Sequence, residues 1–560
     1  MKRTTILAIL TAVILLVSSL STYAAPNKSF SDVTSDYWAT KQILSLANYD
    51  IVSGGADGRF RPVDGLTRSE LTKLLTQAFI LKESTESLSY TDLSASHWAF
   101  TFISKAIAGE LMNGFPDNTF RPDARTTRAQ VAKILVLAKG YSILNISTKT
   151  FSDVSSAYWG YPYIEAAAKN SLISGYPDGT FRPDAEITRA EAAALIYRSL
   201  IGKDYLIENS TINEVSFERY RRFQEAGPLN INVLKVPKVA PVSIDLGLAR
   251  DRVTGLEQLS SMAKRKNALA GINADFFSTN GGGCSGIMVD GQIISSPISI
   301  RSYFGILPDK TCFINRAFMD AMITAETTAG VEKRGVISWI NKARDSFTDT
   351  IVAYTPFYGP STLTNNNGTE VIVKLEGTVT PNSEIIGKVI DVRYNAGNTT
   401  ISPDGIILSG IGPSKNFLTE NMKRGGIIKL TFNLKPYWQD NATAIGGGPR
   451  LIRGGQVGVE NEGFDSGLVS RKHPRTGIGI DSQGNLVIVV IDGRMSYFSI
   501  GMTLPELATE LKNRGAVDAM SMDGGGSSAL YFNGSVRNYP NGASGERAIN
   551  NAVLFIPYQS

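Results

Sequence analysis

The sequence predicts a multidomain chain, in which an all-α bundle of three repeats precedes a C-terminal mixed α/β (α+β) domain with a β-rich middle segment. Two observations predict this. One type of segment recurs three times before residue 202, and each copy has apolar residues at helical spacing. From about Leu229 the sequence changes to short β-branched runs separated by Gly, Asn and Pro. A chain of 560 residues has room for both parts.

The N-terminus has the pattern of a secretory signal. Lys2 and Arg3 precede an apolar run from Ile6 to Val17, and small residues follow up to Ala24. The run is too short to cross a bilayer core of about 30 Å as a helix. We therefore expect a signal peptide at 1–24, a secreted protein, and no transmembrane segment in the mature chain.

The repeats keep a constant period. Trp38, Trp98 and Trp159 are 60 and 61 residues apart, and so are Arg68, Arg128 and Arg189. In each copy a threonine directly before the arginine is the expected N-cap of one helix, and an upstream helix is its expected partner. One helix pair cannot bury its own apolar face, so we expect the copies at 25–86, 87–147 and 148–202 to pack together.

These copies resemble S-layer homology (SLH) domains. The third copy carries the Phe151–Val154 opening, the Gly175–Pro183 turn and the Thr188–Glu191 box. The resemblance implies binding to an anionic, often pyruvylated, secondary cell-wall polymer, and a place in the cell wall or S-layer. The first copy has Gly55-Ala56 where the third has Tyr176-Pro177, so we expect the ligand grooves to differ. The candidate polymer-binding residues are Arg68, Arg128, Arg189, Trp38, Trp98 and Trp159.

These candidates also have a structural interpretation. The arginines are equally typical of a salt bridge or a contact at a helix start, although their recurrence at one position favours ligand binding. We interpret the tryptophans as core and groove wall rather than as chemical groups.

The remaining chain divides into a linker and one large domain. Residues 203–228 are polar and charged and are predicted to be a linker, whereas 229–560 form the C-terminal domain. Thr503 and Glu506 form a predicted capping box, and the helix that they begin lies between the runs Leu486–Ile491 and Val517–Met522. We expect these two runs to pair as parallel strands with a right-handed crossover. Residues 325–440 are strand-rich and are expected to form a subdomain or insertion that shapes the cleft.

The chemistry is expected at glycine loops that follow strands. Asp523 precedes Gly524, Gly525, Gly526 and Ser527, where close backbone approach leaves N–H groups free to face an anion. Further charged or polar residues stand in similar loops, and arginines beside carboxylates suit both a phosphate and glycosyl transfer. These residues are Asn273, Asp275, His473, Arg475, Asp492, Arg494, Glu546 and Arg547.

In this order, these segments resemble the phosphodiester glycosidase family, over about 230–560. The resemblance is most specific at Asn273–Phe277, His473–Gly479, Asp492–Arg494, Gly501–Ala508 and Asp523–Ser528. It implies hydrolysis of a sugar-1-phosphodiester at the glycosidic bond, with release of the sugar and a phosphomonoester.

Roles follow from the chemistry that this reaction needs. The catalytic candidates are Asp523, then Asp275, as base or nucleophile, with His473 as a proton carrier and Asp492 as a further carboxylate. The candidate substrate-binding residues are Arg475, Arg494, Gly524, Gly525, Gly526, Ser527, Asn273, Glu546 and Arg547. His473 equally suits a role in orienting its loop, and Glu546 and Arg547 suit an internal ion pair.

Composition excludes several other classes. The formal charge of +5 falls to +3 without Lys2 and Arg3, and no basic cluster follows one element, so we expect no nucleic-acid partner. One histidine and two separated cysteines in the C-terminal domain cannot build a usual zinc site. No cofactor is identified, although loop carboxylates are compatible with calcium. Cys284 and Cys312 are equally compatible with a disulfide and with two thiols.

Three function classes fit these observations. The first is a wall-anchored hydrolase of sugar-phosphate linkages, and the second is a non-catalytic surface protein that holds a glycan phosphate in the same loops. The third is a structural S-layer component. The density of charged residues in the glycine loops disfavours the third class.

Overall fold

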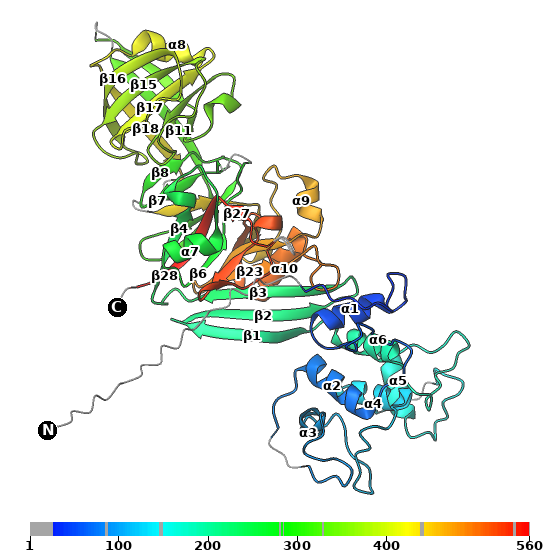
Figure 1. Cartoon of the computed structure of the whole chain (residues 1–560). Coiled ribbons are helices and arrows are strands. Elements are labelled where there is room, and N and C mark those ends of the chain that lie inside the picture. The colour runs from blue at the N-terminus through cyan, green and yellow to red at the C-terminus, as the bar shows by residue number, and fades with distance from the viewer. Residues whose placement is uncertain are drawn as a thin grey trace, which may run out of the picture.

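The computed structural model describes residues 26–84, 88–144, 149–278, 282–283, 285–326, 330–436, 442–540 and 545–558. The expected signal peptide at 1–24 lies outside these residues. Figure 1 shows three parts in a row: the repeats at one end, a central β-rich part, and a β-rich insertion at the far end. Within the described residues, no helix combines the length and the apolar character that crossing a bilayer requires.

Each repeat contributes two helices, and each second helix begins at a threonine capping box. The partner helix lies in a different repeat from the one expected: α2 packs on α3, α4 on α5, and α6 on α1. The bridges Gly65↔Thr188, Thr67↔Arg125 and Thr127↔Glu186 close the three copies into a ring. The helices are α1 (Thr40–Asn48), α2 (Arg68–Phe79), α3 (Phe100–Ala108), α4 (Arg128–Lys139), α5 (Tyr161–Lys169) and α6 (Arg189–Leu200).

The predicted fold class is wrong in two respects. The repeats are not an all-α bundle, because long turns and β-bridges join their helices. In each turn, one carboxylate holds two backbone N–H groups, as Asp153 does with Phe181 and Arg182 at 2.8 and 2.7 Å. The C-terminal part is built mainly from β-sheets rather than as a balanced α/β domain. Periodicity predicts the helices, but it does not predict how much of each part consists of turns and strands.

The residues expected to be a linker also form strands. β1 and β2 fall within 203–228 and extend the central sheet, because alternate side chains such as Phe217 and Phe223 are fully buried. In the described part of the chain, this sheet has the order β1 (Asp204–Ile212), β2 (Val215–Phe223), β3 (Pro228–Val236), β23 (Leu486–Ile491), β22 (Arg475–Asp481), β24 (Ala516–Ser521), β20 (Arg450–Arg453) and β21 (Gln456–Val457).

The predicted strand–helix–strand unit exists, but its pairing is different. β22 lies between β23 and β24 and pairs antiparallel with both, so the two strands are not direct neighbours. The helix α10 (Leu504–Asn513) begins at the predicted Thr503 capping box and covers one face of this sheet. The sheet thereby brings the ends of β22, β23 and β24 to the region of the predicted chemistry.

Smaller sheets pack on the other face of the central sheet. Their shared core includes Phe304, Ile478, Ile488, Phe532 and Val553. The sheets are β26 (Ser535–Val536), β25 (Leu530–Phe532), β6 (Ala270–Asn273), β28 (Asn551–Pro557) and β4 (Val242–Leu248); β10 (Cys312–Arg316), β9 (Ser302–Ile306), β19 (Thr443–Gly446), β7 (Ile287–Val289) and β8 (Gln292–Ser295); and β27 (Ala548–Ile549) with β5 (Glu257–Gln258), beside α7 (Leu259–Arg265).

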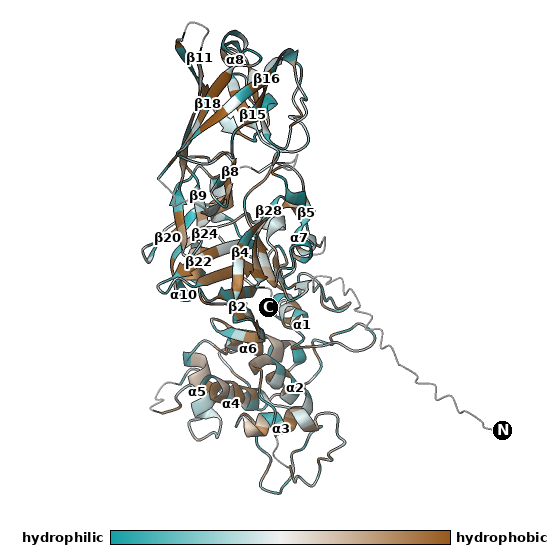
Figure 2. Ribbon diagram, turned by 90° about the vertical axis from the view of Figure 1, so that its left-hand side faces the viewer, coloured by the Kyte–Doolittle hydropathy of each residue, from teal (hydrophilic) through white to brown (hydrophobic). Residues whose placement is uncertain are grey.

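The insertion curls around its own hydrophobic core. Figure 2 shows its apolar strands as a body separate from the central sheets. Its sheet has the order β12 (Glu332–Ile337), β11 (Phe318–Glu326), β18 (Ile427–Lys435), β16 (Glu384–Ala396), β15 (Gly368–Leu375), β17 (Gly405–Ile411), β14 (Thr350–Tyr354) and β13 (Trp339–Ile340), with α8 (Ser414–Asn421) packed on it. The expected subdomain at 325–440 is therefore a nearly closed barrel, since β12 also contacts β14.

Candidate functional site

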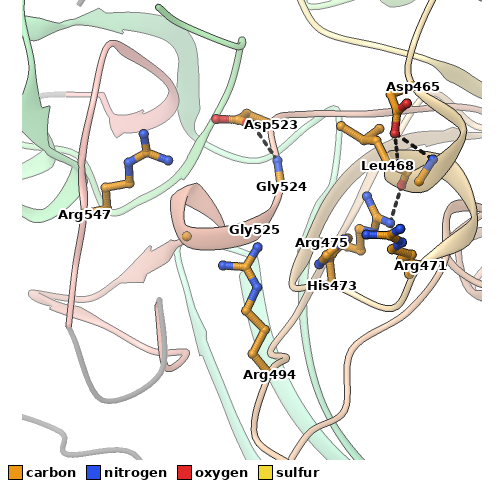
Figure 3. Close-up of a pocket in the computed structure, with 12 residues that line it drawn as sticks. Asp465, Leu468, Arg471, His473, Arg475, Arg494, Asp523, Gly524, Gly525 and Arg547 are labelled. Atoms are coloured by element: carbon orange, nitrogen blue, oxygen red, sulfur yellow. Dashed lines mark hydrogen bonds between the residues drawn. The ribbon is translucent and has the colours of Figure 1, made fainter. Parts of the chain in front are cut away.

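A cavity of about 540 Å³ opens where β24 ends, and it collects most of the predicted loop residues (Figure 3). None of its lining residues comes from the insertion, so the expectation that 325–440 shape the cleft receives no support there. The residues lining it are Asp465, Gly467, Leu468, Arg471, His473, Arg475, Arg494, Asp523, Gly524, Gly525, Gly526 and Arg547.

Backbone and amide contacts fix Asp523 at the edge of the sheet. Its N–H donates to Ala274 O at 2.8 Å, and Asn273 Nδ2 donates to its carbonyl oxygen at 2.7 Å. Asn273 Oδ1 in turn accepts from Thr476 Oγ1 at 2.7 Å and from Ala529 N–H at 3.0 Å. Asn273 is 1% exposed and does not line the cavity, so it positions the Asp523 loop from behind.

The glycine amides are mostly not free for an anion. Gly524 N–H donates to Asp523 Oδ1 at 2.8 Å, and Gly525 N–H donates to Pro474 O at 2.9 Å. Gly525 has a φ of +60°, which favours glycine, and Ser527 is buried behind it. Among these three amides, only that of Gly526 has no hydrogen-bond partner within the described chain. An anion would therefore contact mainly side chains.

The carboxyl group of Asp523 has a pKa close to neutral pH. Burial raises its pKa to about 6, although Ser527, the Gly524 N–H and Arg547 favour the charged form. The charge of Asp275 adds to the increase in the pKa of Asp523. Asp523 can thus hold or release a proton near pH 6.

Arginines surround this carboxylate. Figure 3 shows Arg494 and Arg547 approaching the Asp523–Gly525 loop from two sides, with Arg471 and Arg475 beyond Gly524. Arg494 Nη2 lies 3.0 Å from the point that a Cβ on Gly525 would occupy. Arg547 Nη1 donates to Ser527 Oγ at 3.4 Å. Among the ion pairs of the described residues there is none between Arg547 and Glu546, whose carboxylate accepts from Ser260 instead.

Arg475 is partly a structural residue. It is 2% exposed, and its guanidinium donates to Met502 O at 2.8 Å, Leu468 O at 2.6 Å and Arg471 O at 2.8 Å. These bonds hold α9 (Ser466–Ser470) over the cavity. Burial, with Arg494 nearby, lowers its pKa to about 10, so it stays charged at neutral pH.

His473 lines the cavity with one unused ring nitrogen. Its Nδ1 is buried and has no hydrogen-bond partner in the described part of the chain. Burial and the nearby Arg475, Arg494 and Arg471 lower its pKa, so it is neutral at pH 7. Its backbone pairs with Met502 at 3.1 and 3.0 Å, which supports the alternative that His473 orients its loop.

Besides Asn273 and Ser527, three predicted residues lie outside the cavity lining. Asp275 is 2% exposed and accepts Ser285 N–H at 2.8 Å, and burial raises its pKa to about 6. Asp492 is fully buried and accepts from Asn230, Asn232, Asn538 and Tyr539 at 2.6, 3.4, 3.0 and 2.8 Å. Glu546 accepts Ser260 N–H at 2.7 Å near the start of α7.

Sequence reasoning missed the α9 side of the cavity. Asp465 caps this helix by accepting Gly467 N–H at 2.7 Å, and Arg471 follows its end. The signal that could have identified the helix is an aspartate followed by Ser466 and Gly467, directly before the basic segment that contains His473. Its position over the cavity depends on Arg475, which local sequence does not reveal.

The repeats carry a second hollow, of about 410 Å³. Trp38 of the first copy, Arg128 of the second, and Tyr176 and Glu191 of the third all line it. Arg128 Nη1 donates to Glu191 Oε1 at 2.7 Å. Trp38, Trp98 and Trp159 are 58%, 55% and 50% exposed, so they are not core residues, although Trp38 does line the groove.

The repeat arginines join one copy to the next. Arg68 Nε donates to Phe120 O at 2.8 Å, Arg128 Nε to Phe181 O at 2.8 Å, and Arg189 Nε to Phe60 O at 2.9 Å. All three arginines therefore make contacts between copies, and Arg128 also faces the groove. Ligand binding by these arginines stays a prediction.

The pairing of the cysteines and the binding of a metal both remain predictions. Cys284 lies outside the described residues, so its pairing with Cys312 stays a prediction. Among the residues that are described, no three His, Cys, Asp or Glu side chains gather as a metal site would require. Calcium also stays a prediction.

Comparison with known families agrees with both parts of the chain. The S-layer homology domain model matches residues 29–72, 89–132 and 150–193, and the phosphodiester glycosidase model matches residues 369–556. These matches confirm the two resemblances and leave the domain boundaries as predictions.

Two curated relatives each match about a quarter of this chain. Cell surface glycoprotein 1 of Acetivibrio thermocellus is 38% identical over 160 residues, which are 26% of this chain and 7% of the relative. The cellulosome-anchoring protein of the same organism is 36% identical over 156 residues, which are 27% of this chain and 35% of the relative. The chain thus spans about a third or less of their lengths.

A solved structure shares the fold of the larger part. A hypothetical protein from Synechocystis superposes with a TM-score of 0.52 at 22% identity, covering 62% of this chain and 64% of that chain.

Proposed function

We propose that this chain, which carries three S-layer homology domains followed by a phosphodiester glycosidase domain, hydrolyses sugar-1-phosphodiesters at the cell surface. The observation that carries the proposal is the position of Asp523, a carboxyl group of raised pKa that faces arginines across one cavity. Such a site combines a group for chemistry at carbon with cations for a phosphate.

The charge of the cavity supports a phosphate ligand. Arg471, Arg494 and Arg547 are exposed and line the same space. A guanidinium can donate two hydrogen bonds to phosphate oxygens, and it keeps its charge at any relevant pH. These side chains replace the glycine amides as the proposed phosphate donors.

The reaction forms a bond from oxygen to the anomeric carbon and breaks the bond from that carbon to the phosphate oxygen. The phosphate leaves with the bonding electrons as a phosphomonoester, and the arginines stabilise its growing charge. Asp523 either removes a proton from the attacking water or attacks the carbon itself before water releases the sugar. Both routes need the ionised carboxylate.

The repeats hold the protein outside the cell, at the wall. The groove between Trp38, Arg128 and Tyr176 offers aromatic surface beside a cation, which suits an anionic sugar polymer. A pyruvylated polymer is the proposed ligand, since its carboxylate would match the guanidinium.

The test is release of free sugar from UDP-GlcNAc or a GlcNAc-1-phosphodiester. Asp523→Asn should lower kcat at least about 100-fold while inorganic phosphate still binds, because Asn keeps the acceptor for Gly524 N–H but cannot act as a base. Asp465→Asn is the matched control in the same cavity. Asn is also a good N-cap, so kcat should change less than about threefold.

Full activity of Asp523→Asn would refute the catalytic assignment. If the unmodified protein binds phosphate but releases no sugar from several sugar phosphodiesters, the alternative of a non-catalytic glycan-phosphate-binding protein is favoured.

A further inference from the structure

One hydrophobic core joins the S-layer homology repeats to the glycosidase part. Phe223 of β2 and Phe498 belong to the core cluster of the repeats, where they are 0% and 4% exposed. Met495 and Tyr539 pack against the same cluster. The repeats are therefore not joined to the glycosidase part by a flexible linker alone. They share a buried core with the loop that follows Asp492.

Tyr49, directly after α1, is the contact between the first repeat and that loop. Its Oη donates to Phe498 O at 2.7 Å, and the two rings stack with centroids 4.8 Å apart. The ring of Phe223 meets Tyr49 from another side at 5.4 Å. Burial raises the pKa of Tyr49, so its hydroxyl stays a donor at any working pH.

The loop beyond this contact is a tight turn. Met495 and Ser499 exchange backbone hydrogen bonds of 3.0 and 2.8 Å, and Ser499 Oγ donates to Asp492 O at 2.6 Å. Phe498 also meets Tyr539 edge-on at 5.0 Å. Fixing Phe498 therefore fixes the turn from 494 to 499.

Arg494 begins this turn and reaches the cavity. Its φ of +64° is unusual for a residue with a side chain, and its guanidinium lies against Gly525. Within the described chain, the Arg494 side chain makes no hydrogen bond or ion pair. Its position in the cavity therefore depends on the backbone of the turn.

We infer that Tyr49 of the first S-layer homology repeat is a positioning residue for the candidate active site, because it fixes the 494–499 turn that presents Arg494 to the phosphate. The inference depends on the proposed function in one point only, namely that the ligand of Arg494 is a phosphate. The S-layer homology repeats would thus help to form the phosphate site, in addition to anchoring the protein.

The experiment compares two tyrosine hydroxyls of the same interface in the full chain. Tyr49→Phe removes the bond to Phe498 O but keeps the ring. Tyr197→Phe is the matched control, since Tyr197 Oη donates to Gln224 O at 2.7 Å, which lies outside the turn. Calorimetry with inorganic phosphate, KM and kcat with UDP-GlcNAc, and the melting temperature are measured for both.

Tyr49→Phe should weaken phosphate binding and raise KM by about threefold to tenfold with little change in kcat, while Tyr197→Phe stays within about twofold. Adding Tyr49→Phe to Arg494→Ala should cause no further loss, since both act through one side chain. Equal effects of the two tyrosine variants, or additive effects with Arg494→Ala, would overturn the inference.

Hydrogen exchange separates this inference from the proposed function. Tyr49→Phe should speed amide exchange at 494–499, and Tyr197→Phe should not. Unchanged exchange there overturns the inference, even if the protein hydrolyses sugar phosphodiesters. Faster exchange supports the inference, even if no sugar is released.

Discussion

Asp523 is subject to opposing influences. Burial favours its neutral acid, whereas the Gly524 N–H and Arg547 favour the carboxylate, and the resulting pKa is about 6. Its role as base or nucleophile needs the carboxylate. A phosphodiester stays a monoanion across the same pH range, so the enzyme and not the substrate would titrate.

We expect kcat/KM to be constant above pH 7 and to fall about tenfold per pH unit well below pH 6, because protonation of Asp523 removes the reactive form. A pH–rate profile with a phosphodiester substrate measures this. In His473→Gln the fall near pH 6 should persist, because the protonation of Asp523 causes it. If the fall disappears in that variant, His473 and not Asp523 carries it.

The residues that sequence could identify are those whose chemistry is local. Asp523 stands before three glycines and was found from that pattern. The roles of Asn273 and Asp492 cannot be predicted from local sequence, because both depend on partners far along the chain, such as Thr476 and Asn538. Tyr49 gave no signal at all, since its partner is 449 residues away.

Among helices and strands, too, the sequence predicts the features that depend on neighbouring residues and misses those that depend on distant ones. The Thr503 capping box correctly placed α10, because its hydrogen bonds join residues three apart. The insertion of β22 between β23 and β24 could not be foreseen, because register between distant strands is set by the folded sheet. The 203–228 segment is predicted as a linker because it carries many charged side chains, but in the strands these are half-buried and form ion pairs, such as Arg222 with Asp204.

The short helix α9 depends on Arg475. None of its residues is buried, and it has five residues, so its own packing and helix propensity hold it weakly. Arg475→Lys removes the guanidinium fork and cannot make all three bonds to Leu468 O, Arg471 O and Met502 O. We expect faster amide exchange at 465–471 and about tenfold weaker phosphate binding, as Arg471 loses its position.

Lys472→Met provides the control for this helix. It breaks the Lys472–Glu506 ion pair of 2.7 Å, which is half-exposed and should contribute less than about 1 kcal/mol. Phosphate binding that falls equally in both variants would show that the charge of this region, and not the α9 tether, is responsible.

At the scale of the molecule, the chain joins a near-threefold anchor to the cavity of the candidate active site. The three copies contact one another in a ring, with each repeat arginine bound to a carbonyl of the next turn. Their period was evident from the sequence, but the ring was not, because the arginine contacts cross from copy to copy. The equivalent positions Gly55, Phe115 and Tyr176 make the three junctions unequal.

These differences predict unequal binding of wall polymer. The Trp38 junction combines Arg128 with Tyr176, whose hydroxyl donates to Glu191 at 3.0 Å. In the sequence repeat, the positions that correspond to Arg128 and Tyr176 for Trp98 are Arg189 and Gly55, and Gly55 offers no ring. Trp38→Ala should therefore reduce co-sedimentation with purified cell walls about tenfold, and Trp98→Ala by less than about threefold. Both tryptophans are more than half exposed, so neither change should unfold the anchor, and matching melting temperatures would verify this. A larger loss for Trp98→Ala would contradict the assignment of the Trp38 groove as the main polymer site.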